Sequence, residues 1–197
     1  MGTALEQMHE IEPHIQVGRA RAGVLMLILS DSLSIVAILA AGGYLSAMNV
    51  EGQFTIKGDH GPAFLPSLLV AIALVLSGLS YYWWVQGVHK NEVTVPKLSF
   101  ILAFVLMLVV LVVQIFIGET LGFTNPPFHA YESLIMLLTW YSAAHFLLTV
   151  IIGLLLLGRV MRSRLVSHKY LAEVVGYWWY YTVIASLLMW LFSAFVR

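Results

Sequence analysis

Hydrophobic residues gather into five long stretches that are separated by short polar segments. Each stretch exceeds the roughly 20 residues that an α-helix needs to cross about 30 Å of hydrocarbon. In lipid the backbone has to satisfy its own hydrogen bonds, which favours helices. The pattern therefore predicts an all-α, polytopic membrane bundle. It forms a single membrane domain over 1–197, with five transmembrane helices at about 22–48, 62–88, 97–121, 130–160 and 170–196.

The positive charges in the connecting segments predict how the bundle is oriented. Only Lys57 and Arg197 fall on one side of it. The remaining Lys and Arg fall in the N-terminal tail and in the second and fourth connections, which share the other side: Arg19, Arg21, Lys90, Lys97, Arg159, Arg162, Arg164 and Lys169. Because segments rich in Lys and Arg stay in the cytoplasm, we expect 1–21 to be a cytoplasmic tail and the C-terminus to lie outside.

Composition narrows the classes of function that remain. Hydrophobic residues make up 60% of the 197 residues and charged residues 10%, whereas soluble domains contain about 25% charged residues. Positive and negative charges balance at ten each, which gives no indication of a nucleic-acid partner. Cysteine is absent, so disulfides, thiolate catalysis and metal sites that need cysteine ligands are excluded.

A few ionisable residues lie deep in the predicted spans. Asp31 lies about 14 Å from the cytoplasmic end of its helix, His145 about 20 Å, and Tyr180 and Tyr181 about 15 Å, at 1.5 Å per residue. These depths overlap when helix tilt is allowed for. We therefore predict one buried polar cluster that joins Asp31, His145 and a tyrosine of the fifth span.

The cluster has two interpretations. A carboxylate near the middle of the membrane costs about 2.5–3.5 kcal/mol on the insertion scale, and pairing or protonation reduces that cost. The cluster could carry a proton or hold a tuned acid, or it could be an interhelical hydrogen-bond group that fixes packing. The second interpretation is favoured because the sequence places no polar ladder from the cluster to both membrane faces.

Three further acids lie near the ends of the spans. Glu132 is expected at the outer mouth of the fourth span, and Glu119, with Gln114, near the outer end of the third. They could be solvated at the interface or line a water-filled outer cleft. Glu173, near the inner start of the fifth span, could collect protons at the surface or favour a helix N-terminus.

The chain is not expected to hold a metal or to catalyse a reaction by itself. Of its seven histidines, only His145 is deep in a predicted span. Haem and copper centres in membranes need several ligands that converge from neighbouring helices. Neither a glycine-rich phosphate loop nor a nucleophile elbow is present. We therefore predict no catalytic residue and no metal site in this chain.

Motif-like stretches occur in a suggestive order: Ser30-Asp31; Gln114 and Glu119; Tyr141-Ser142-Ala143-Ala144-His145-Phe146 with Gly153; and Glu173 followed by Gly176-Tyr177-Trp178-Trp179-Tyr180-Tyr181-Thr182. This order resembles subunit III of haem–copper oxidases, a family that includes the quinol-oxidase counterpart and accessory proteins of nitric oxide reductase. In this comparison Asp31 matches the family's buried acid and His145 the second histidine of its penultimate span. Ser142 stands in place of the first histidine.

The resemblance implies a non-catalytic subunit of a respiratory complex in a bacterial inner membrane. Such a subunit packs against catalytic subunit I, which contains the haem and copper. It also binds phospholipid between two groups of helices, supports proton uptake and protects the catalytic site during turnover. Asp31 would be the carboxylate that reacts with carbodiimides in some members of the family.

Other functions remain open from the sequence. A small transporter or channel component would explain the intramembrane acid and histidine, although no span is interrupted by Gly or Pro near its middle, as in many transporters. An accessory subunit of nitric oxide reductase, and a membrane enzyme that uses a partly buried carboxylate, are further alternatives. The electron donor of an oxidase, cytochrome c or quinol, also stays open.

Overall fold

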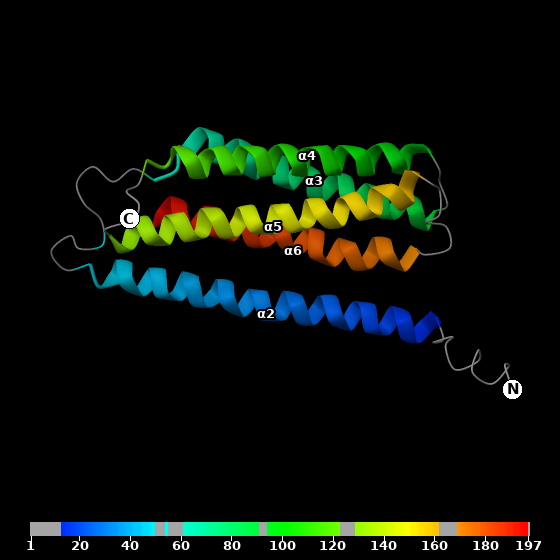
Figure 1. Ribbon diagram of the computed structural model, residues 1–197, viewed down its shortest axis with the longest axis horizontal. Helices are drawn as coiled ribbons and strands as arrows, with labels where there is room; N and C mark the ends of the chain where they lie inside the picture. The colour runs from blue at the N-terminus through cyan, green and yellow to red at the C-terminus, as the bar shows by residue number, and fades with distance from the viewer. Residues whose placement is uncertain are drawn as a thin grey trace, which may run out of the picture.

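The computed structural model describes residues 13–49, 54, 61–90, 94–122, 129–161 and 169–196 (Figure 1). They form five long helices: α2 (Pro13–Ala47), α3 (Phe64–His89), α4 (Thr94–Thr120), α5 (Ala130–Met161) and α6 (Lys169–Phe195). Each is long and apolar enough to cross a membrane. The prediction of a five-helix membrane bundle is therefore confirmed.

The helix bounds agree with the sequence pattern except at the N-terminus. Helices α3 to α6 begin and end within three residues of the predicted spans. Helix α2 begins at Pro13, nine residues before the predicted start at Ala22. Thus part of the expected tail, from 13 to 21, is helical, while 1–12 lies outside the described residues. Proline is tolerated in the first turn of a helix, and a helix can extend past the hydrocarbon into the polar interface.

The helices run alternately up and down, so two ends of the bundle can be named. At the end that we call the basic end, α2 begins, α3 ends, α4 begins, α5 ends and α6 begins (Figure 1). The described positive residues of the connections, among them Arg19, Lys90 and Lys169, belong to this end. At the opposite end, the far end, α2 ends and α6 reaches Val196. Lys57, Arg162, Arg164 and Arg197 lie outside the described residues.

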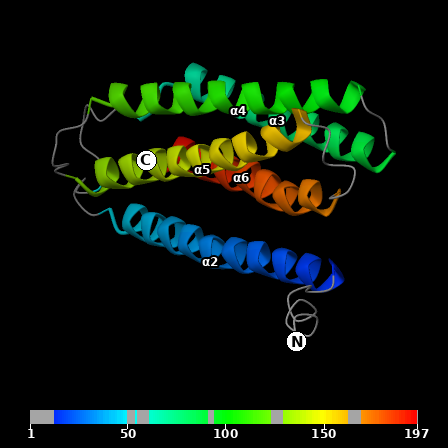
Figure 2. The ribbon, with the colours of Figure 1, turned by 45° about the vertical axis from the view of Figure 1, so that its right-hand side comes forward.

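The five helices form three layers. Helices α3 and α4 lie side by side, α5 and α6 form the middle layer, and α2 lies against the outer side of α6 and α5 (Figures 1 and 2). The main aromatic core fills the space between α3, α4, α5 and α6. Its Tyr81 and Trp179 rings stack at 4.7 Å between centroids, and both side chains are completely buried.

Hydrogen bonds and close contacts between helices hold α3, α4, α5 and α6 together. Trp179 Nε1 donates to Ser77 Oγ at 3.1 Å, and Ser77 Oγ donates to the carbonyl of Ala103 at 2.8 Å. Gly153 lets α5 approach α4, because a Cβ there would lie 2.8 Å from Phe104 Cδ2. In membranes, where lipid competes for apolar contacts, small residues and polar bonds of this kind provide much of the helix association.

Helix α2 is attached much less extensively than the others. Only 6% of its most hydrophobic stretch is buried inside the protein, against 39–50% for the other four helices. At the far end Gly42 lets α2 approach α5, since a Cβ there would lie 2.6 Å from Leu134 Cδ2. Most of the remaining α2 surface faces outward. Its few polar contacts to α5 and α6 therefore have a large share in positioning it.

Candidate functional site

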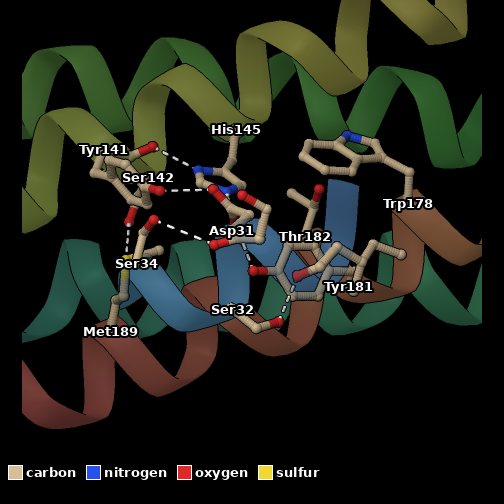
Figure 3. A network of polar contacts seen from close by, with 12 residues as sticks. Asp31, Ser32, Ser34, Tyr141, Ser142, His145, Trp178, Tyr181, Thr182 and Met189 are labelled. Atoms are coloured by element: carbon tan, nitrogen blue, oxygen red, sulfur yellow. Dashed lines mark hydrogen bonds and ion pairs between the residues drawn. The ribbon is translucent and has the colours of Figure 1, made fainter. Parts of the chain in front are cut away.

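The carboxylate of Asp31 accepts hydrogen bonds from three side chains of the middle layer (Figure 3). Tyr141 donates its hydroxyl to Oδ1 at 2.6 Å, and Tyr181 donates to Oδ2 at 2.5 Å. His145 Nε2 lies 2.7 Å from Oδ2. The side chain of Asp31 is 17% exposed and that of His145 5% exposed. One carboxylate on α2 is thus bonded to both α5 and α6.

The cluster lies at the middle of the bundle. Asp31 is close to the midpoint of the span Val17–Ala47, His145 to that of Ala130–Met161, and Tyr181 to that of Lys169–Phe195. Three helices therefore bring their polar groups to one height in the region where unpaired polar groups are most costly. Mutual hydrogen bonding is what makes this arrangement compatible with the membrane interior.

The neighbours of His145 define where its protons are. Nδ1 lies 2.8 Å from the backbone carbonyl oxygen of Tyr141. A carbonyl can only accept, so Nδ1 has to be the donor. Nε2 then shares one proton with Asp31, either as imidazolium with carboxylate or as imidazole with carboxylic acid. In either arrangement Asp31 and His145 remain hydrogen-bonded, and the two tyrosine hydroxyls can still donate to Asp31.

Aromatic rings surround the imidazole. The indole of Trp178 is parallel to it, with an angle of 4° between planes and 5.7 Å between centroids. The rings of Tyr141 and Tyr181 lie at 4.8 Å and 6.3 Å. These three rings enclose the imidazole and restrict its orientation.

A second polar layer extends the cluster into the α5–α6 interface. Trp178 Nε1 donates to Thr149 Oγ1 at 3.0 Å, and the hydroxyls of Thr149 and Thr182 lie 3.0 Å apart. Thr149 also donates to the carbonyl of His145 at 2.8 Å. This layer fixes the indole that stacks on the imidazole, so it holds His145 in position.

The sequence placed most members of the cluster and misplaced one. Asp31, His145 and Tyr181 meet as predicted. Tyr180 does not belong to the cluster, because successive residues of a helix are about 100° apart. Its ring packs edge-on against Tyr81 at 5.8 Å, in the aromatic core. Tyr141 was missed, although its position four residues before His145 puts it on the same helix face.

The three end-of-span acids have different surroundings. Glu173 accepts from Arg21 at 2.6 Å and lies 3.2 Å from His89 Nε2, so it links α6 to α2 and α3 at the basic end. Glu119 is exposed. Glu132 is only 8% exposed, so simple solvation at the interface is wrong for it. It lies in the first turn of α5, where the helix dipole favours a negative charge.

The site resembles a structural ion pair with one shared proton more than a reaction centre. Among the residues that the structure describes, no three His, Asp or Glu side chains converge where they could hold a metal ion. No family model and no curated protein matches this chain. Its function therefore has to be argued from the geometry of the Asp31 cluster.

Proposed function

We propose that this chain is a non-catalytic integral membrane subunit, similar to subunit III, of a respiratory haem–copper oxidase in a bacterial inner membrane. It would stabilise the catalytic subunit, bind phospholipid and support proton uptake during aerobic electron transport. The haem and copper would be in partner subunits. An accessory subunit of nitric oxide reductase is the nearest variant of this proposal.

One observation supports the proposal more than any other. The acid of the first span, the histidine of the fourth and a tyrosine of the fifth are in direct contact through Asp31, His145 and Tyr181. These residues come from three separate stretches on which the resemblance to subunit III depends. Because the three residues are in contact, a single interaction accounts for the presence of all three stretches. The order of the motifs alone gives no such physical reason.

The surface of the bundle is compatible with a partner and with lipid. Apolar side chains on all five helices face outward, and the described parts outside the membrane are short. Between α2 and α6 near the far end lies an apolar groove lined by Leu39, Leu188, Leu191, Phe192, Phe195 and Val196. An acyl chain of a phospholipid fits the chemistry of this groove, because all its lining side chains are apolar.

A small transporter or channel component is the second candidate. The observation that favours it is the Asp31–His145 pair at the middle of the membrane, since intramembrane ionisable residues often mark transport pathways. The loose attachment of α2 would allow movement of one helix against four. This function would need no partner chain.

Purification from native membranes separates the two candidates. The tagged full-length chain is isolated in mild detergent, and the product is examined by visible absorption spectroscopy and mass spectrometry of the intact complex. An untagged strain is the control for non-specific binding. We expect haem absorbance and larger subunits to co-purify in fixed proportion. A monodisperse chain alone, which moves a solute in liposomes, would contradict the oxidase proposal.

A further inference from the structure

A cavity lies between α3, α4, α5 and α6 in the far-end half of the bundle. It reaches from Pro62 and Ser193 near the far end to Ser142 and Phe146 at mid-height. It contains about 40 Å³ of space that the centre of a water molecule can occupy. Since one water needs roughly 10–15 Å³ of such space, the cavity has room for about three.

The wall of this cavity is rich in hydrogen-bond acceptors. Its described hydroxyl and amide side chains are Ser67, Gln114, Thr139, Ser142, Ser186 and Ser193, and the indole of Trp190 also lines it. Four of the five hydroxyls donate their proton to a backbone carbonyl three or four residues earlier in the chain at 2.8–2.9 Å. A hydroxyl oxygen that donates in this way still has lone pairs for accepting. The wall therefore suits a small ligand that supplies protons.

Ser186 carries the fifth hydroxyl, and it makes no such hydrogen bond. Its side chain is only 3% exposed, and its Oγ has no hydrogen-bond partner among the described residues. Buried polar groups are nearly always hydrogen-bonded to protein or to ordered water. On the opposite helix Gln114 Nε2 donates to the carbonyl of Thr139 at 3.2 Å, which leaves other hydrogen-bonding capacity on its amide.

We propose that this cavity is a binding site for ordered water molecules, with Ser186 and Gln114 as its principal anchors. Water matches the site because it donates two protons to the acceptors of the wall and accepts the proton of Ser186. A cation matches less well, because the described lining residues include no carboxylate. The proposal uses only the cavity and its wall, so it stands whether or not the chain belongs to an oxidase.

The bound water extends hydration into the membrane interior from the far end. Ser142 lies at the inner part of the cavity, and its hydroxyl also contacts Met189 Sδ at 3.8 Å across the α5–α6 interface. The next residue in the chain, Tyr141, donates to Asp31 (Figure 3). Water therefore comes within one residue of the Asp31 cluster along α5, on the opposite side of the middle layer from α2.

Radiolytic footprinting of the unmodified full chain tests this directly. Hydroxyl radicals that form from bound water oxidise nearby methionine to its sulfoxide. Met189 lines the cavity and is 1% exposed, whereas Met107, at 0%, lies in the apolar core. We expect Met189 to be oxidised several-fold faster than Met107, and Ser186→Val to reduce that difference. Equal protection of the two methionines would overturn the proposal.

Single cysteines provide an independent measurement, because the chain has no native cysteine. Ser186→Cys places a thiol in the cavity. Ala185→Cys places one at the adjacent position, which is equally buried at 3% but does not line the cavity. We expect the first thiol to react several-fold faster with methyl methanethiosulfonate. Equal rates would count against a water-filled cavity, and the footprinting result decides if either variant does not fold.

Discussion

The imidazole Nε2 of His145 lies 2.7 Å from Oδ2 of Asp31, across 114 positions of sequence. This contact joins the least buried helix of the bundle to its middle layer. Because Tyr181 donates to the same oxygen, α5 and α6 meet α2 at a single carboxylate. The cluster is therefore best described as the polar attachment that keeps α2 in register with the other four helices.

Under the proposed oxidase function, Asp31→Asn is predicted to leave the pH dependence of turnover in the purified complex unchanged. The amide can accept from a tyrosine and donate to Nε2 of neutral His145, so the complex should still assemble. A proton carrier would also need a neighbouring group that delivers protons. The next described charged group towards the basic end is Glu173, which is eight residues or about 12 Å along α6 from Tyr181 and therefore too distant for direct proton exchange. Steady-state turnover across pH measures this. A shifted profile or several-fold slower turnover would show that the carboxylate carries protons.

His145→Leu is predicted to reduce the free energy of unfolding by about 0.6–2 kcal/mol, the range for interhelical hydrogen bonds in membranes. Combined with Asp31→Leu, the loss should be smaller than the sum of the two single losses, because each variant removes the contact between the two side chains. Reversible unfolding in mixed detergent measures all three. His145→Leu with Ser77→Ala is the control pair, and it should be additive since Ser77 bonds Ala103 and Trp179 instead.

Tyr181→Phe and Tyr180→Phe form a matched pair that separates the cluster from the aromatic core. Tyr181→Phe removes a hydrogen bond to a carboxylate and should cost about 1.5–3 kcal/mol of unfolding free energy. Tyr180→Phe keeps the ring that packs on Tyr81 and should change stability by less than about 0.5 kcal/mol. The same detergent unfolding assay applies. Similar losses for both variants would show that the hydroxyl bond to Asp31 contributes little.

Gly153→Ala and Gly158→Ala test the close approach of α5 to α4. At Gly153 a Cβ would lie 2.8 Å from Phe104 and 3.3 Å from Trp179, whereas at Gly158 it would meet nothing within 4 Å. We expect the first change to cost about 1–3 kcal/mol through overpacking. The second should add about 0.5–1 kcal/mol of helix stability. Thermal unfolding distinguishes them, and a stabilising Gly153→Ala would mean that the helices are farther apart than described.

The sequence predicted the five spans because membrane thickness imposes a length on every helix. It missed the start of α2 at Pro13, since hydrophobicity marks where a helix enters lipid and not where its backbone hydrogen bonding begins. That α2 stands apart from the other four could not be predicted either. In a membrane, side chains that face a neighbouring helix and side chains that face acyl chains are both apolar. The hydrophobic pattern therefore does not distinguish the two kinds of surface.

Depth along the helix was enough to predict that Asp31, His145 and a tyrosine of the last span would meet. It could not choose between Tyr180 and Tyr181, because both lie at the same depth and only helix rotation separates them. Glu132 shows the same difficulty: its position near a span end suggested solvation, yet packing around the start of α5 buries it. The relative rotation of packed helices is set by contacts distant in sequence.

The most direct test of the attachment by Asp31 is the distance between α2 and α6 in the full chain. Val36 and Ile184 face outward, with 62% and 58% of their surface exposed. Spin labels on Val36→Cys and Ile184→Cys report the distance between the two helices by pulsed electron paramagnetic resonance in lipid nanodiscs. We predict one narrow distance distribution with Asp31 intact and a broad, longer one with Asp31→Leu, while Ser30→Leu leaves it narrow. An unchanged narrow distribution in Asp31→Leu would show that the cluster does not hold α2 in place.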